Sequence, residues 1–93
     1  MMHLMGIKKY RHGYVGFIET NAGYTYFQFS RGTCKPLQTY LKDDYESRDH
    51  FISVIRKFVH ATFFFRQPVS LETISKDTLE QILVDQQADK HPF

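Results

Sequence analysis

The chain has 93 residues, with nine Phe, six Tyr, no Trp, one Cys and a net charge of +2. A length near 100 residues is typical of one domain, which we place at residues 1–93. The single cysteine excludes an internal disulfide framework and a cysteine-based zinc site. No apolar stretch reaches the roughly 20 residues that span a bilayer, so we expect a cytoplasmic protein without a membrane partner.

Charge is distributed unevenly along the chain. Residues 1–42 carry six Lys or Arg against the single acidic residue Glu19, whereas residues 43–93 carry six against nine. Eight of the fifteen aromatic residues also lie in the first part. Cations interleaved with rings are typical of surfaces that hold phosphates and stack bases. Lysines that protect exposed strand edges from aggregation explain the same composition, so both interpretations stay open.

Two aromatic runs at residues 13–19 and 24–30 predict a β-hairpin. Both runs are rich in Tyr, Phe, Thr, Val and Ile, which favour strands. The Asn21-Ala22-Gly23 connection suits a short hairpin loop with Gly23 in the left-handed conformation. Residues 5–10 predict a further short strand before the hairpin.

Alternation along the second run assigns its side chains to two faces of the sheet. Thr25, Phe27 and Phe29 point to one side, and Tyr24, Tyr26 and Gln28 point to the other. Both sides are partly apolar, so the sheet needs cover on both faces, or a ligand on one. We expect Phe27 and Phe29, with Phe17 or Ile18, to form the core, and Tyr24, Tyr26 and Tyr14 to form a contact surface.

The next segment predicts the end of a small sheet. Arg31-Gly32-Thr33 predicts a second turn, and residues 35–41 a third strand, in which Pro36 belongs at the start or on an edge. With the hairpin, this strand forms a three-stranded antiparallel meander within residues 1–42. An unclosed sheet also leaves an edge that favours a homodimer by strand pairing.

Residues 43–93 predict the helical part of an α+β fold. A helical stripe from Phe51 to Phe65 predicts an amphipathic helix over 47–65, capped by Ser47 or Asp49, that packs on the sheet. A second, short C-terminal helix is predicted over 75–85, with Ser75 as its N-cap and Ile74 stapled onto Leu79. Residues 69–74 suit a short edge strand, and the tail after Gln86 is polar.

Three segments carry a family resemblance: Gly6–Tyr10, Gly13–Ile18 and Thr25–Ser30. They resemble the RNA-binding hairpin of cold-shock domains, which are small OB-fold barrels. The resemblance implies base contacts by Tyr14 or Val15, Phe17, Tyr26 and Gln28, and phosphate contacts by Lys8, Lys9 and Arg11. Val15 is an additional residue in this pattern, so Tyr14 and Phe17 share a face only if a β-bulge absorbs it. Residues after Ser30 do not match the family.

Catalytic chemistry has little support in the sequence. The carboxylates between Asp43 and Asp49 precede a helix start, where acidic residues are favoured electrostatically, and they lack the spacing of a calcium loop. Cys34 has no base or orienting group at a recognisable spacing. We therefore expect neither an enzyme nor a cofactor.

The sequence favours a small non-catalytic nucleic-acid-binding module, with single-stranded ligands preferred. The predicted contact residues are Lys8, Lys9, Arg11, Tyr14, Phe17, Tyr24, Tyr26, Gln28, Arg31 and Lys35. The alternative is a protein-interaction or inhibitor module of a phage or other mobile element, homodimeric through the edge or face of its sheet. The choice among RNA, DNA and protein as partner stays open, as do the oligomeric state and the origin.

Overall fold

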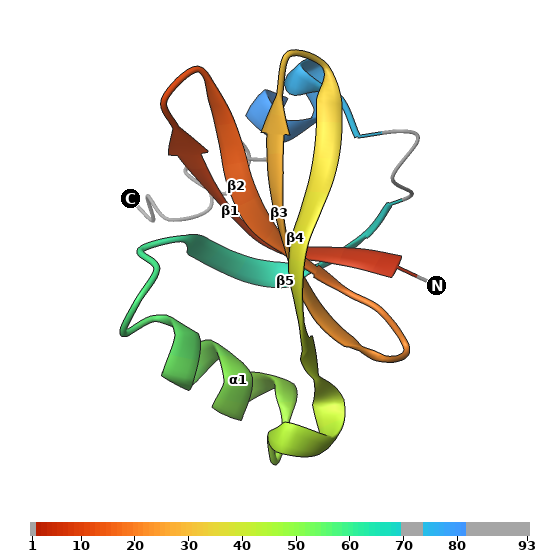
Figure 1. Cartoon of the computed structure of the whole chain (residues 1–93), viewed down its shortest axis with the longest axis vertical. Coiled ribbons are helices and arrows are strands. Elements are labelled where there is room, and N and C mark those ends of the chain that lie inside the picture. Colours follow the sequence, from red (N-terminus) through yellow and green to blue (C-terminus); the bar gives the residue numbers. More distant parts are fainter. Residues whose placement is uncertain (1, 70–73, 82–93) are drawn as a thin grey trace, which may run out of the picture.

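The computed structural model describes residues 2–69 and 74–81 and has an α+β fold (Figure 1). Its antiparallel sheet has five strands in the order β4-β3-β2-β1-β5. The strands are β1 (Met2–Tyr10), β2 (Gly13–Glu19), β3 (Gly23–Ser30), β4 (Thr33–Leu41) and β5 (Thr62–Val69). A 3₁₀ turn, η1 (Lys42–Asp44), and a helix, α1 (Arg48–Ile55), connect β4 to β5. A second helical segment covers 76–81.

The sheet is larger than the three-stranded meander predicted from the sequence. Strands β1 to β4 form a four-stranded meander, and β5 returns to pair with the outer side of β1. The predicted strand at residues 5–10 is present, but it begins at Met2. The chain therefore closes one edge of the meander with a strand that follows the helix.

The predicted helix over 47–65 is correct only in its first half. Helix α1 ends at Ile55, and Thr62–Val69 pairs with β1 from Ile7↔Thr62 to Met2↔Val69. A short aromatic run fits a buried strand as well as a helix, and periodicity alone does not separate them. Pro68 fits in β5 because an edge strand tolerates a residue that cannot donate to a ladder.

Strands β2 and β3 pair without a register shift from Tyr14↔Phe29 to Glu19↔Tyr24. No β-bulge therefore absorbs Val15, and Tyr14 and Phe17 lie on opposite faces of the sheet. The irregularity lies instead in β1, between Leu4 and Gly6. The resemblance to cold-shock domains requires a bulge at Val15 to bring Tyr14 and Phe17 onto one face. The structure has no such bulge.

Apolar cores cover both faces of the sheet. We call the side of β3 that carries Phe27 and Phe29 the Phe face, and the side that carries Tyr24 and Tyr26 the Tyr face. The Phe-face core contains Leu4, Ile7, Tyr14, Ile18, Phe27 and Phe29, together with Ile74 and Leu79 from the C-terminal segment. The Tyr-face core contains Met5, Phe17 and Tyr24, together with Phe51 and Ile55 from α1.

Helix α1 covers the part of the Tyr face around Phe17 and Tyr24, where the sequence predicted an open contact surface. The Phe51 ring is fully buried and stacks on Tyr24, with centroids 4.2 Å apart and an interplanar angle of 14°. It also meets Phe17 edge-on at 5.5 Å and Tyr45 at 5.0 Å. Such aromatic pairs add to the free energy gained by burying their area. The rings on the Tyr face therefore attract the helix rather than leaving that face open.

Local capping fixes where both helical segments begin. The Ser47 hydroxyl accepts a hydrogen bond from the His50 N–H at 3.1 Å, and the Ser75 hydroxyl accepts one from the Thr78 N–H at 3.2 Å. Ile74 and Leu79 pack in the same core, as a hydrophobic staple requires. The rest of the predicted 75–85 helix, the polar tail and most of the predicted 69–74 strand lie outside the described residues. Within the described ranges, no helix is long and apolar enough to cross a bilayer.

The hairpin loop differs from its prediction. Among the described residues, positive φ angles occur at Arg11, Arg31 and Gly32, and not at Gly23. Gly23 is needed because its backbone passes close to the Tyr40 carbonyl oxygen, which a Cβ atom would strike. The Thr20 hydroxyl organises the loop instead, because it accepts hydrogen bonds from the N–H groups of Ala22 and Gly23, each at 3.2 Å.

Candidate nucleic-acid interface

Five of the six Lys and Arg side chains in residues 1–42 lie toward one end of the sheet, and Lys42 lies at the other end, in η1. The β1–β2 turn carries Arg11 and His12, and the β3–β4 turn carries Arg31. All three side chains are exposed. Both turns lie at the top of Figure 1, at the end of the sheet opposite α1, and we call this end the turn end. This placement follows from the meander, because alternate hairpin turns fall at the same end.

A row of four residues, three of them polar, crosses the Tyr face just below these turns. The register pairs Lys8 with Val15, Val15 with Gln28, and Gln28 with Lys35. Directly paired residues project to the same side of a sheet, so this row belongs to the Tyr face. Lys35 is exposed, and Lys8 and Gln28 are half-buried. Three strand spacings place the two lysine Cα atoms roughly 14 Å apart.

Tyr10, Tyr26 and Tyr40 lie on the Tyr face, and Tyr40 also packs against Phe51 of α1, with ring centroids 5.7 Å apart. Tyr26 is half-buried and packs one side of its ring against Phe17, with centroids 5.1 Å apart. Burial raises the pKa of Tyr26, and the neighbouring phenols of Tyr10 and Tyr40 raise it further. Tyr10 is 39% exposed, and the Arg11 guanidinium lies 5.2 Å from its ring centroid. The Tyr40 hydroxyl donates to the Gln38 side-chain oxygen at 3.5 Å.

Three of the predicted contact residues lie inside the cores. Tyr14, Phe17 and Tyr24 are 2%, 0% and 3% exposed. Tyr14 faces the C-terminal segment on the Phe face, and Phe17 and Tyr24 lie beneath Phe51 of α1. Their rings therefore offer no free side on which a base could stack in this structure.

The other predicted residues are brought together at the turn end. Lys8, Tyr26, Gln28 and Lys35 share the Tyr face, Arg11 and Arg31 occupy the turns, and Lys9 is exposed on the Phe face. Sequence reasoning missed Tyr10, His12 and Tyr40. The alternation of Lys8 with Tyr10 along β1 was a usable signal for Tyr10. No sequence signal indicated Tyr40, because the side of the sheet to which it points depends on the register irregularity beside Phe27 in the β3–β4 pair.

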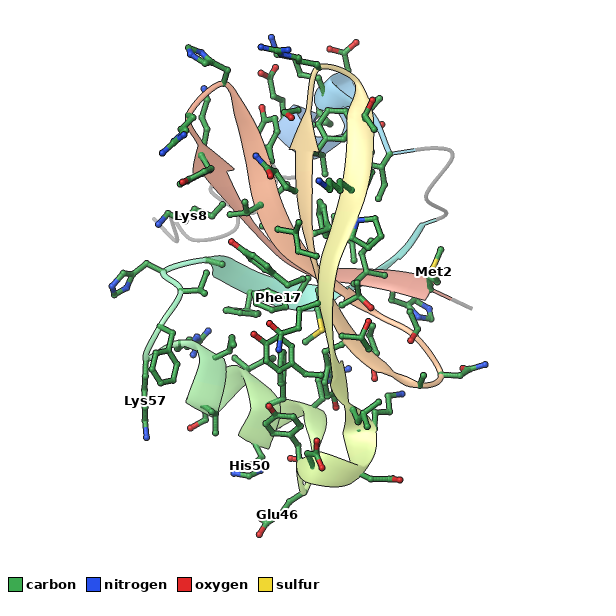
Figure 2. The ribbon with its side chains drawn as sticks, viewed as in Figure 1. Met2, Lys8, Phe17, Glu46, His50 and Lys57 are labelled. Carbon is green, nitrogen blue, oxygen red and sulfur yellow. The ribbon has the colours of Figure 1, made fainter. Side chains whose placement is uncertain are left out.

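The acidic side chains of the described residues lie either at the opposite end of the sheet or on its Phe face. Asp43, Asp44, Glu46 and Asp49 lie in or near η1 and the start of α1, and Figure 2 shows Glu46 far from Lys8. Glu19, at the same end as η1, is bound by Lys42 with N and O atoms 3.1 Å apart. Burial raises the pKa of Tyr14, and the nearby carboxylates of Glu80 and Asp77 on the Phe face raise it further. Positive charge without nearby carboxylates is therefore concentrated on the Tyr-face side of the turn end.

This arrangement can bind phosphates through its cations and bases through half-exposed rings. Within the described part of the chain, no three His, Cys, Asp or Glu side chains are grouped so that they could hold a metal ion. The functional interpretation thus depends on surface charge and aromatic exposure. Comparisons of the chain with protein-family models, with curated proteins and with solved structures found no significant match.

Proposed function

We propose that the protein is a non-catalytic module that binds single-stranded nucleic acid across the turn end of its Tyr face. The observation that carries the proposal is the row of Lys8, Gln28 and Lys35 beside the partly exposed rings of Tyr10 and Tyr26. Cations on neighbouring strands with rings between them are the arrangement by which sheet surfaces track a backbone and stack its bases.

Each group has a distinct role in this proposal. Lys8 and Lys35 contact phosphates on the sheet, and Arg11 and Arg31 contact phosphates at the turns. Tyr10 and Tyr26 stack bases, and the Gln28 amide hydrogen-bonds to a base edge. A single strand is favoured over a duplex because rings on a sheet can stack only on bases that are free of their partners. Lys9 is peripheral because it shares the Phe face with Asp77 and Glu80.

The resemblance of residues 6–30 to the hairpin of cold-shock domains supports the proposal at two positions. Tyr26 and Gln28 fall at base-contacting positions by that resemblance, and both stay half-exposed. It lends no support to Tyr14 and Phe17, which point to opposite faces.

Replacement of Tyr10 tests the proposal with little risk to the fold, because this ring is 39% exposed. A stacked base contributes roughly 1–3 kcal/mol, so Tyr10→Ala should weaken binding of an oligo(dT) or oligo(U) by about 5- to 150-fold. Fluorescence anisotropy at low salt measures the affinity. The matched control is Leu41→Ala, at the opposite end of β4 and 54% exposed, which should leave affinity unchanged. Absence of oligonucleotide binding by the wild type at low salt contradicts the proposal.

A second candidate is a protein-interaction module that dimerises through the edge of β4. Leu37 and Leu41 are 47% and 54% exposed on this edge strand, which favours a protein contact. Pro36 and the register irregularity beside it interrupt the edge, and both features reduce strand pairing. A stable dimer by light scattering, together with absent oligonucleotide binding, would favour this candidate over the first.

A further inference from the structure

Phe58 is the most exposed large apolar side chain among the described residues, at 77%. It lies in the turn after α1, and this turn is held in place. The N–H groups of Phe58 and Val59 both donate to the Ile55 carbonyl at 2.9 Å, and Val59 packs against the Tyr-face core. The backbone thus holds Phe58 outward while its neighbour points inward. A single exposed apolar residue is ordinary on a protein surface, so its surroundings decide its meaning.

The surroundings of Phe58 are cationic. Arg56, Lys57 and His60 lie within two residues of it, and no acidic residue occurs between Asp49 and Glu72. Lys57 and His60 are exposed. The Arg56 guanidinium lies 5.4 Å from the ring centroid of Phe63, which fixes its charge beside the start of β5. An exposed ring among cations without a carboxylate repeats the composition of the turn end of the Tyr face.

The sheet register brings this turn next to the basic half of β1. Ile7 pairs with Thr62, so the residues just before Thr62 run beside Lys8 and Lys9. One strand spacing and three residues of chain place the Phe58 Cα within roughly 16 Å of the Lys8 Cα. Figure 2 shows Lys8 and Lys57 along the same side of the molecule. This span equals about five stacked nucleotides at roughly 3.4 Å each, or fewer extended ones.

We propose that a nucleic-acid strand bound on the Tyr face continues past Lys8 to the turn at residues 56–61, where a base stacks on Phe58 and a phosphate contacts Lys57. This inference rests on the proposed function and extends its site by a second stacking position. We expect this turn to bind an anionic chain rather than an apolar partner. Phe58 is its only large apolar side chain that is open to solvent, and the residues around it are cationic.

A tryptophan reporter tests this contact directly. The chain contains no Trp, so Phe58→Trp provides a single reporter at the proposed site. Addition of an oligo(dT) of about twelve nucleotides should quench its fluorescence at the concentrations at which the wild type binds. A reporter placed at the other exposed site, Leu41→Trp, should not respond and is the matched control.

A length series separates this inference from the function on which it rests. Phe58→Ala should weaken binding of a strand of about twelve nucleotides by about fivefold or more, and leave unchanged the binding of one of about four. If the wild type binds no oligonucleotide, the proposed function itself fails. If the wild type binds but the Phe58→Trp reporter is silent and Phe58→Ala is neutral at every length, only this inference fails. A response of the Phe58→Trp reporter to phosphatidylserine vesicles and not to oligo(dT) would also overturn it.

Discussion

At the scale of single residues, Tyr14 shows how a predicted contact residue became part of the core. Its hydroxyl is buried and makes no hydrogen bond of good geometry among the described residues, although the Glu80 carboxylate lies close enough to act on its proton. A buried polar group without a partner costs roughly 1–3 kcal/mol of folding free energy. Burial raises the pKa of Tyr14 from 10.0, the hydrogen-bonding and charge interactions with Glu80 raise it further, and the charge of Asp77 adds to the shift. The ring contributes packing, whereas its hydroxyl works against the fold.

We therefore expect Tyr14→Phe to increase the free energy of unfolding by about 1 kcal/mol at pH 7, measured by urea denaturation. The folded-state pKa lies above the unfolded value, so the stabilisation from the bound phenolic proton is full below about pH 10 and is lost as pH rises through the folded pKa. Stability of the variant should consequently fall less steeply above about pH 10 than that of the wild type. Tyr10→Phe, at a half-exposed ring, should match the wild type at neutral pH. A loss of about 1 kcal/mol or more in Tyr14→Phe would contradict this expectation and show that the hydroxyl donates a stabilising hydrogen bond, with Glu80 as the nearby acceptor.

At the scale of elements, α1 decides which part of the Tyr face stays exposed. Its start depends on Ser47, whose hydroxyl accepts from the His50 N–H. Loss of a serine N-cap typically costs about 1 kcal/mol. Ser47→Ala should lower the free energy of unfolding by that amount, whereas Ser53→Ala, on the exposed side of the same helix, should change it by less than about 0.5 kcal/mol. Equal effects in thermal or urea unfolding would contradict the capping role.

Local signals predicted the elements that depend on local chemistry. The hairpin strands, the turn at Arg31-Gly32 and the caps Ser47 and Ser75 could all be predicted, because each depends on a few adjacent residues. The strand at Thr62–Val69 could not, because its aromatic run fits either period and its partner β1 is distant in sequence. Alternation sorted Tyr24, Tyr26 and Phe27 onto the correct faces. It could not show which face α1 covers, because both faces carry rings and only tertiary packing selects one.

At the scale of the whole molecule, charge is distributed unevenly over the sheet, with an excess of basic side chains on the Tyr-face side of one end. Basic side chains occupy the turn end and the side of β1, and most of the described carboxylates lie around η1 and the start of α1. The sequence shows the excess of basic charge in residues 1–42. The meander explains why most of these side chains lie at one end of the sheet, because the β1–β2 and β3–β4 turns fall at the same end. Such polarity steers an anionic ligand to one end before any specific contact forms. Of the ten predicted contact residues, those with charge stayed accessible, whereas three of the rings were needed for the cores.

We propose that Lys8 and Lys35 neutralise phosphates on the Tyr face, and the sharpest test of these two contacts is a salt titration of oligo(dT) binding. Each phosphate contact to a single strand contributes about 0.7 to the slope of log affinity against log salt. The double variant Lys8→Gln/Lys35→Gln should therefore lower the magnitude of that slope by about 1.4. The control Arg48→Gln removes a charge at the start of α1, at the end of the sheet opposite this row, and should leave the slope unchanged. Equal slopes in the wild type and the Lys8/Lys35 variant would contradict the account.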